Sequence, residues 1–100
     1  MIQGTTPIHI FNMPFDTANI KNVRITYAQN NAVVLTKELV DCTIEGNAVM
    51  AKLSQEETFL FDVNAPVDIQ IRVLTNGGDA LASKVQRVGL RSVLDGAVLE

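Results

Sequence analysis

Apolar and polar residues alternate in short blocks along this chain, and Asn, Gly and Asp residues separate the blocks. In one such block, Val23, Ile25 and Tyr27 occupy alternate positions, so an extended strand would place them on one face. A repeat of two residues is typical of strands that have one face in the core and the other in solvent, whereas a helix needs a repeat of 3.6. The pattern therefore predicts an all-β protein.

Short turn sequences join the blocks into hairpins. Asn30-Asn31 lies between strands that we expect near 21–29 and 32–38, and asparagine tolerates the positive φ angles that tight hairpin turns need. Gly46-Asn47 divides a second pair of alternating blocks in the same way. Two hairpins are therefore predicted in the first half of the chain.

The block from Val67 to Leu74 alternates most regularly, so we expect it to form a central strand. Asn76–Asp79 supplies a flexible corner after it. In the next strand the apolar residues stand first at odd and then at even positions, which predicts a bulge near Gln86-Arg87 or a crossing between sheets. The first strand, 7–13, has apolar residues on both faces, so the sequence does not decide which face points into the core.

A single helical turn is predicted near 54–58. Ser54 precedes Glu57 by three residues, so hydroxyl and carboxylate can cap each other's backbone amides. The residues that follow, Phe59, Leu60 and Phe61, are expected to close one end of the core. Residues 15–19 are interpreted as a loop or a further helical turn.

About seven short antiparallel strands in one hundred residues predict a single immunoglobulin-like β-sandwich domain over 1–100, with a small closed barrel as the alternative. A composition of 47% hydrophobic and 19% charged residues is sufficient for a core. The one cysteine, Cys42, cannot close a disulfide within the chain.

Charge and hydropathy narrow the classes of partner. The net charge is -3 and the eight basic residues are scattered, so we expect no nucleic acid partner. No apolar run approaches the roughly 20 residues of a membrane-spanning helix, so no membrane partner is expected. The first residues lack a charged head followed by an apolar run, which predicts a protein made in the cytosol.

Candidate catalytic groups are few. His9 and Cys42 are the single imidazole and the single thiol, and no catalytic signature surrounds either residue. They also cannot supply the three or four nitrogen and sulfur ligands that zinc needs, and Cys42 lies in an apolar pattern typical of a buried thiol. Glu56-Glu57 is explained by helix capping. We therefore expect no enzyme activity, no cofactor and no metal.

The polar face of the central strands is the remaining candidate site. Arginine is enriched where partner surfaces meet, and glutamine offers orienting hydrogen bonds. The alternative is an ordinary solvated sheet face. The possible partner-binding residues are Arg24, Thr26, Gln70 and Arg72.

Several strings of the chain resemble a group of uncharacterised short proteins that prophages and tailed phages of Firmicutes encode. Members of that group usually have leucine where this chain has Met13, and threonine where it has Ser54. The order of elements is also similar to that of immunoglobulin-like domains in phage baseplate proteins. The strings are QGTTP (3–7), MPFD (13–16), TYAQ (26–29), LSQEET (53–58) and IQIRVLTNGGDALAS (69–83).

The resemblance implies a non-catalytic structural or assembly module of a phage particle, located in the virion. Its expected partners are other phage structural proteins or further copies of itself. A host-surface or glycan-binding adhesion module is the alternative function. The resemblance assigns no catalytic residue and does not say which part of the particle is involved.

Overall fold

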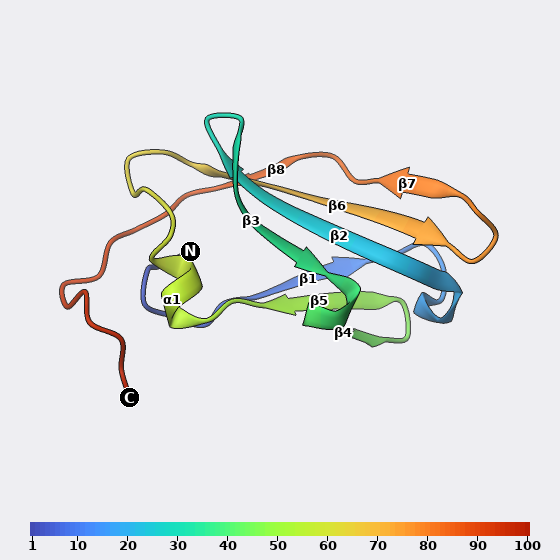
Figure 1. The fold of residues 1–100 in the computed structure, drawn as a ribbon, viewed down its shortest axis with the longest axis horizontal. Coiled ribbons are helices and arrows are strands. Elements are labelled where there is room, and N and C mark those ends of the chain that lie inside the picture. Colours follow the sequence, from blue (N-terminus) through green and yellow to red (C-terminus); the bar gives the residue numbers. More distant parts are fainter.

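A computed structural model describes all residues 1–100 and shows two antiparallel sheets packed face to face (Figure 1). The larger sheet has the order β3 (Ala32–Glu38), β2 (Ile20–Gln29), β6 (Val67–Thr75) and β7 (Ala80–Ala82), and β8 (Gln86–Val88) also pairs with β6. The smaller sheet has the order β1 (Ile8–Asn12), β5 (Ala48–Lys52) and β4 (Cys42–Glu45). The helical elements are η1 (Thr17–Asn19), η2 (Leu39–Asp41) and α1 (Gln55–Thr58).

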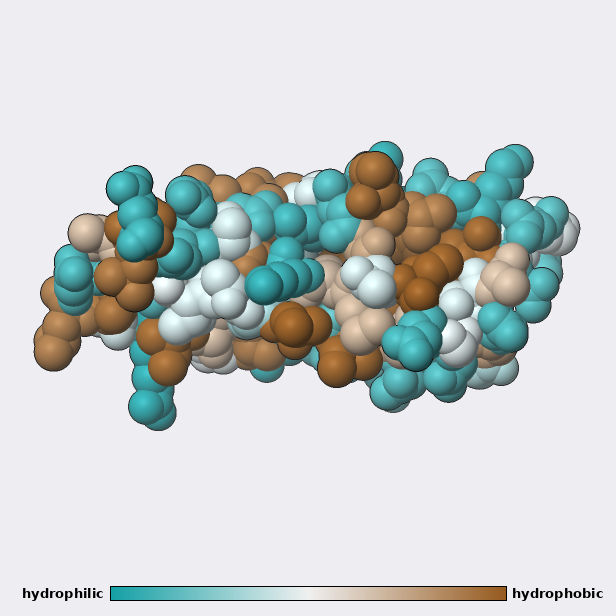
Figure 2. Space-filling view, turned by 90° about the horizontal axis from the view of Figure 1, so that it is seen from below, coloured by the Kyte–Doolittle hydropathy of each residue, from teal (hydrophilic) through white to brown (hydrophobic).

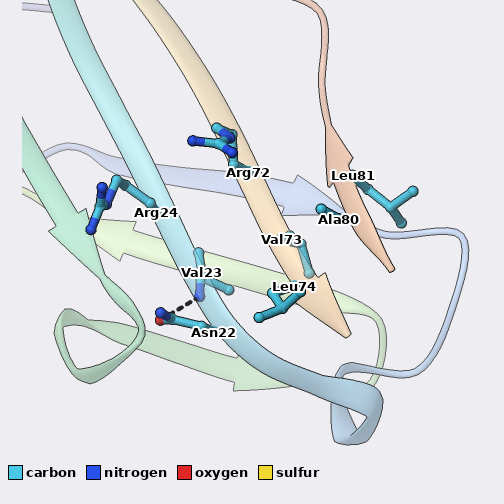
Figure 3. A pocket seen from close by; sticks show the side chains of 8 residues that line it. All are labelled: Asn22, Val23, Arg24, Arg72, Val73, Leu74, Ala80 and Leu81. Carbon is cyan, nitrogen blue, oxygen red and sulfur yellow. Dashed lines mark hydrogen bonds between the residues drawn. The ribbon is translucent and has the colours of Figure 1, made fainter. Parts of the chain in front are cut away.

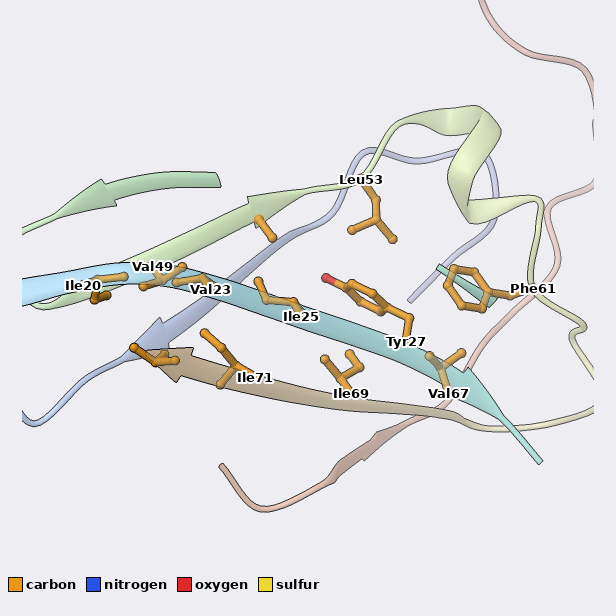
Figure 4. Packing of buried hydrophobic residues seen from close by; sticks show 12 residues of the cluster. Ile20, Val23, Ile25, Tyr27, Val49, Leu53, Phe61, Val67, Ile69 and Ile71 are labelled. Carbon is orange, nitrogen blue, oxygen red and sulfur yellow. The ribbon is translucent and has the colours of Figure 1, made fainter. Parts of the chain in front are cut away.

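The core lies between the sheets and consists mainly of alternate residues of their strands, with Leu53 and Phe61 added from the segments next to α1 (Figure 4). This arrangement confirms the all-β sandwich with its single α-helical turn, and the central place of β6. Both sheets have open edges, so the closed-barrel alternative was wrong. The buried cluster contains Ile20, Val23, Ile25, Tyr27, Val49, Ala51, Leu53, Phe61, Val67, Ile69, Ile71 and Val73.

Both predicted hairpins are present, and the turn of the first has the expected backbone. Asn30 and Asn31 have φ angles of 51° and 65°. Positive φ at both central residues is the geometry of the turn whose twist matches the flanking strands. In the second hairpin Gly46 takes a φ of 59°.

A bulge in β3 decides which of its side chains enter the sandwich. Tyr27 pairs with Leu35 but Ala28 pairs with Val33, so Val34 is the extra residue. Beyond the bulge Ile25 pairs with Lys37, and the lysine side chain is therefore on the core side of the sheet. Because one extra residue exchanges the two faces of a strand, Lys37 without the bulge would point into solvent.

The predicted last strand is divided into β7 and β8, which both pair with β6 of the larger sheet. Arg72 pairs with Ala82 and Ile69 with Gln86. The segment from Ala82 to Gln86 is therefore one residue longer than the segment of β6 that it lies beside. The extra residue lies in 83–85, where Ser83 exchanges backbone and hydroxyl hydrogen bonds with Ile71. The predicted bulge is thus present but earlier than Gln86-Arg87, and the strand does not cross to the other sheet.

The structure assigns the inner face of β1 that the sequence left open. Ile8 and Ile10 are 56% and 58% exposed, whereas His9 and Phe11 face the core. The prediction for the segment after α1 was partly wrong, because only Phe61 enters the core and Leu60 is 58% exposed. Consecutive side chains at a helix end diverge by about 100°, so they cannot all point inward.

The C-terminal tail, residues 92–100, contains no helix or strand and lies at the α1 end of the molecule (Figure 1). Its hydrogen bonds to the rest of the chain join Leu99 to the side chain of Gln55, at 2.8 and 3.0 Å. Just before it, Arg91 pairs with Ile2. None of the helices has the length and apolar character that crossing a bilayer requires.

Candidate functional site

The outer face of the larger sheet brings the four predicted partner-binding residues together. In the pairing of β2 with β6, Arg24 lies opposite Arg72 and Thr26 lies opposite Gln70. Ile25, between the two β2 residues, is fully buried, so its neighbours project from the opposite face. The two strands thus present a compact polar surface on which the guanidinium groups of Arg24 and Arg72 are neighbours.

The two arginines have different electrostatic surroundings. Arg24 Nε donates to Glu38 Oε1 at 3.1 Å, and the Arg24 side chain is 57% exposed. Arg72 is exposed and has no carboxylate within ion-pair distance. Like charges directly opposite each other on neighbouring strands destabilise a sheet by roughly 0.2–1 kcal/mol. Arg72 therefore carries a positive charge that nothing in the chain neutralises.

Gln70, Asp68 and Arg87 on this face have hydrogen-bond partners within the chain. The Gln70 side-chain amide donates to the Ser83 carbonyl at 2.8 Å, which holds the irregular segment between β7 and β8. Arg87 donates two hydrogen bonds to Asp68, at 2.9 and 3.3 Å. The hydrogen bond from Arg87 lowers the pKa of Asp68 below its ordinary value. Gln70 consequently has a structural role in addition to its place on the face.

A shallow hollow of about 200 Å³ lies beside the two arginines (Figure 3). It is smaller than the roughly 300–1,000 Å³ of typical small-molecule pockets, so it suits a single side chain. The sequence pattern did not reveal it, because it depends on how β7 lies against β6. We call it the outer hollow, and its lining residues are Asn22, Val23, Arg24, Arg72, Val73, Leu74, Ala80 and Leu81.

His9 and Cys42 both face the inside of the sandwich but flank Ala51 from opposite sides. The structure shows no hydrogen bond between them, and His9 Nδ1 lies 2.8 Å from the Tyr27 hydroxyl. Burial lowers the pKa of His9 and raises the pKa of Tyr27. Burial and the neighbouring Asp41 also raise the pKa of Cys42, which disfavours the thiolate.

A second hollow, of about 300 Å³, opens between the β1 side of the smaller sheet and β7. Most of its lining is apolar and includes Phe15, with Asn12 and Ser83 as polar members. Tyr27 is fully buried and offers no stacking surface to a sugar. The hollow therefore offers one partly exposed aromatic ring, that of Phe15, together with its two polar groups.

No group of three or more His, Cys, Asp or Glu side chains is placed to hold a metal ion. The arrangement of the outer face suits contact with another protein surface, because an uncompensated arginine stands beside an apolar hollow. Comparisons of the chain with protein-family models, with curated proteins and with solved structures found no match.

Proposed function

We propose that this chain is a non-catalytic structural or assembly module of a tailed-phage particle, which works through protein contacts on the outer face of its larger sheet. The strings that resemble short phage proteins, such as 13–16 and 69–83, support the phage origin. The sandwich supports the structural role, because it presents polar residues on the outer face of a sheet that packs on a core.

The observation that carries the proposal is the position of Arg72 directly opposite Arg24. Arg72 is exposed, and a neutral residue at its position would remove the repulsion. Arginine is among the residues most enriched in the centre of protein interfaces, where a partner's carboxylate can neutralise it. The repulsion that destabilises the isolated chain is thereby offset by the partner's carboxylate in the complex.

Purified particles from a host that carries the gene test the proposal. Mass spectrometry should detect the chain in the particles, and Arg72→Glu should reduce its incorporation by about tenfold or more because the interface charge is reversed. Lys52→Glu is the matched control, since Lys52 is exposed on the smaller sheet and the charge change is equal. Absence of the wild-type chain from particles, or equal loss with both variants, would contradict the proposal.

A further inference from the structure

The outer hollow combines an apolar floor with a positive rim. Leu74 and Ala80 line one side, and Arg72 stands at the other. Leu74 is half-buried and Ala80 is exposed, whereas Leu81 lies opposite the inward-facing Val73 and points to the other face of the sheet. A complementary occupant has an apolar side chain for the floor and a carboxylate for the guanidinium groups.

The C-terminal tail of the same protein has this combination in two consecutive residues. Leu94 is 108% exposed, so its side chain makes no packing contact within the chain. Asp95 follows it and is also exposed. One Asp95 oxygen accepts a hydrogen bond from the Ala97 amide at 2.9 Å, and the carboxylate has no ion pair.

The tail and the outer hollow lie at opposite ends of an elongated molecule. The longest extent of the protein is 46 Å, with α1 and the tail at one end and the turn between β6 and β7 at the other (Figure 1). Figure 2 shows apolar side chains exposed at the end where Figure 1 places the tail. Because Leu99 is hydrogen-bonded to Gln55 of α1, the tail cannot reach the hollow of its own chain.

We propose that the C-terminal tail of one copy docks in the outer hollow of a second copy, with Leu94 on the apolar floor and Asp95 against Arg72. This inference rests on the proposed function and names a second copy as the partner at the same face. Two different patches at opposite ends form a heterologous contact, which repeats head to tail and builds a ring or a filament. Such repetition lets a small individual contact contribute to a large assembly.

Sedimentation velocity on the full chain tests the contact. The weight-average sedimentation coefficient of the wild type should rise with protein concentration, and it should stay that of a monomer for Arg72→Glu and for Leu94→Asp. Lys52→Glu, which makes the same charge change on the other sheet, should associate like the wild type. Circular dichroism of each variant verifies the fold, which both exposed substitutions leave in place.

Mixing the two variants distinguishes a head-to-tail contact from any other. Arg72→Glu retains an intact tail and Leu94→Asp retains an intact hollow, so an equimolar mixture should form a species of two chains and nothing larger. In a single chain, Arg72→Glu combined with Asp95→Lys should restore association. Failure of the mixture to associate, or association of Arg72→Glu alone, would overturn the proposal.

A wild type that remains monomeric up to millimolar concentration would also overturn the docking of one copy on another. The proposed function is judged separately by the incorporation of the Arg72→Glu chain into particles. If incorporation depends on Arg72 while the purified chain is monomeric, the face binds a different phage protein. Self-docking would then be wrong and the proposed function would stand.

Discussion

The ammonium group of Lys37 lies 2.7 Å from the carboxylate of Glu57, across the gap between the two sheets. Lys37 belongs to the edge strand β3 and Glu57 to α1, which follows the smaller sheet. The same carboxylate accepts a hydrogen bond from the Ser54 amide at 2.8 Å. Glu57 therefore caps the helical turn and neutralises a lysine that points inward, and an inward lysine also protects an edge strand from unwanted pairing.

Glu57→Gln should lower the free energy of unfolding by about 1–2 kcal/mol, because it weakens the cap and leaves a largely buried ammonium group without its counter-charge. Urea denaturation measures this change. Glu56→Gln is the control, since Glu56 is exposed and makes no ion pair, and its effect should stay within about 0.5 kcal/mol. Equal losses in the two variants would contradict the role assigned to the ion pair.

The buried pair of His9 and Tyr27 should make stability depend on pH. Burial lowers the pKa of His9 from 6.5, so the unfolded chain binds a proton more readily than the folded protein. The stabilisation is therefore complete well above the unfolded pKa of 6.5 and is lost as the pH falls through 6.5 towards the lower pKa of the folded protein. His9→Gln, whose amide can still bond the Tyr27 hydroxyl, should remove most of this slope in urea titrations. A slope that persists unchanged in the variant would show that another group causes it.

The alternation of apolar residues was enough to predict the sandwich, because β5, β6 and the part of β2 that begins at Val23 bury every second residue. It could not predict the inner face of β1, where both parities carry apolar side chains. The immunoglobulin-like topology remains a prediction. The physical reason for such gaps is that strand pairing depends on contacts between distant segments, which a local period does not contain.

The candidate site was predictable only in part for the same reason. Arg24, Thr26, Gln70 and Arg72 were recognisable as polar positions of two strands, but their direct pairing needed the register of β2 on β6. The place of Glu38 beside Arg24 depends on the bulge at Val34, since an unbroken hairpin would set Lys37 there instead. This bulge leaves no trace in the hydrophobic pattern, because Val33, Val34 and Leu35 are all apolar.

The turn at Asn30-Asn31 should respond strongly to the shape of the side chain. Asn31 has a φ of 65°, and Asn31→Val should destabilise the protein by about 1–2 kcal/mol because a β-branched residue clashes with its backbone there. Asn31→Gly should be neutral or stabilise it by a few tenths of a kcal/mol, since Asn-Gly favours this turn. Thermal denaturation of both variants measures the difference. Similar melting temperatures for the two would contradict the positive φ.

Arg72→Gln should stabilise the isolated chain, because it removes the repulsion from Arg24 and breaks no ion pair. The expected gain in the free energy of unfolding is about 0.2–1 kcal/mol at low salt. It should shrink as salt is added, because the screening length falls from about 10 Å at 0.1 M to about 3 Å at 1 M. Arg24→Gln should gain less, since it also loses the ion pair with Glu38. A destabilised Arg72→Gln chain, or a gain in stability that does not change with salt, would contradict the repulsion between Arg72 and Arg24. Arg72 would then contribute to the stability of the fold.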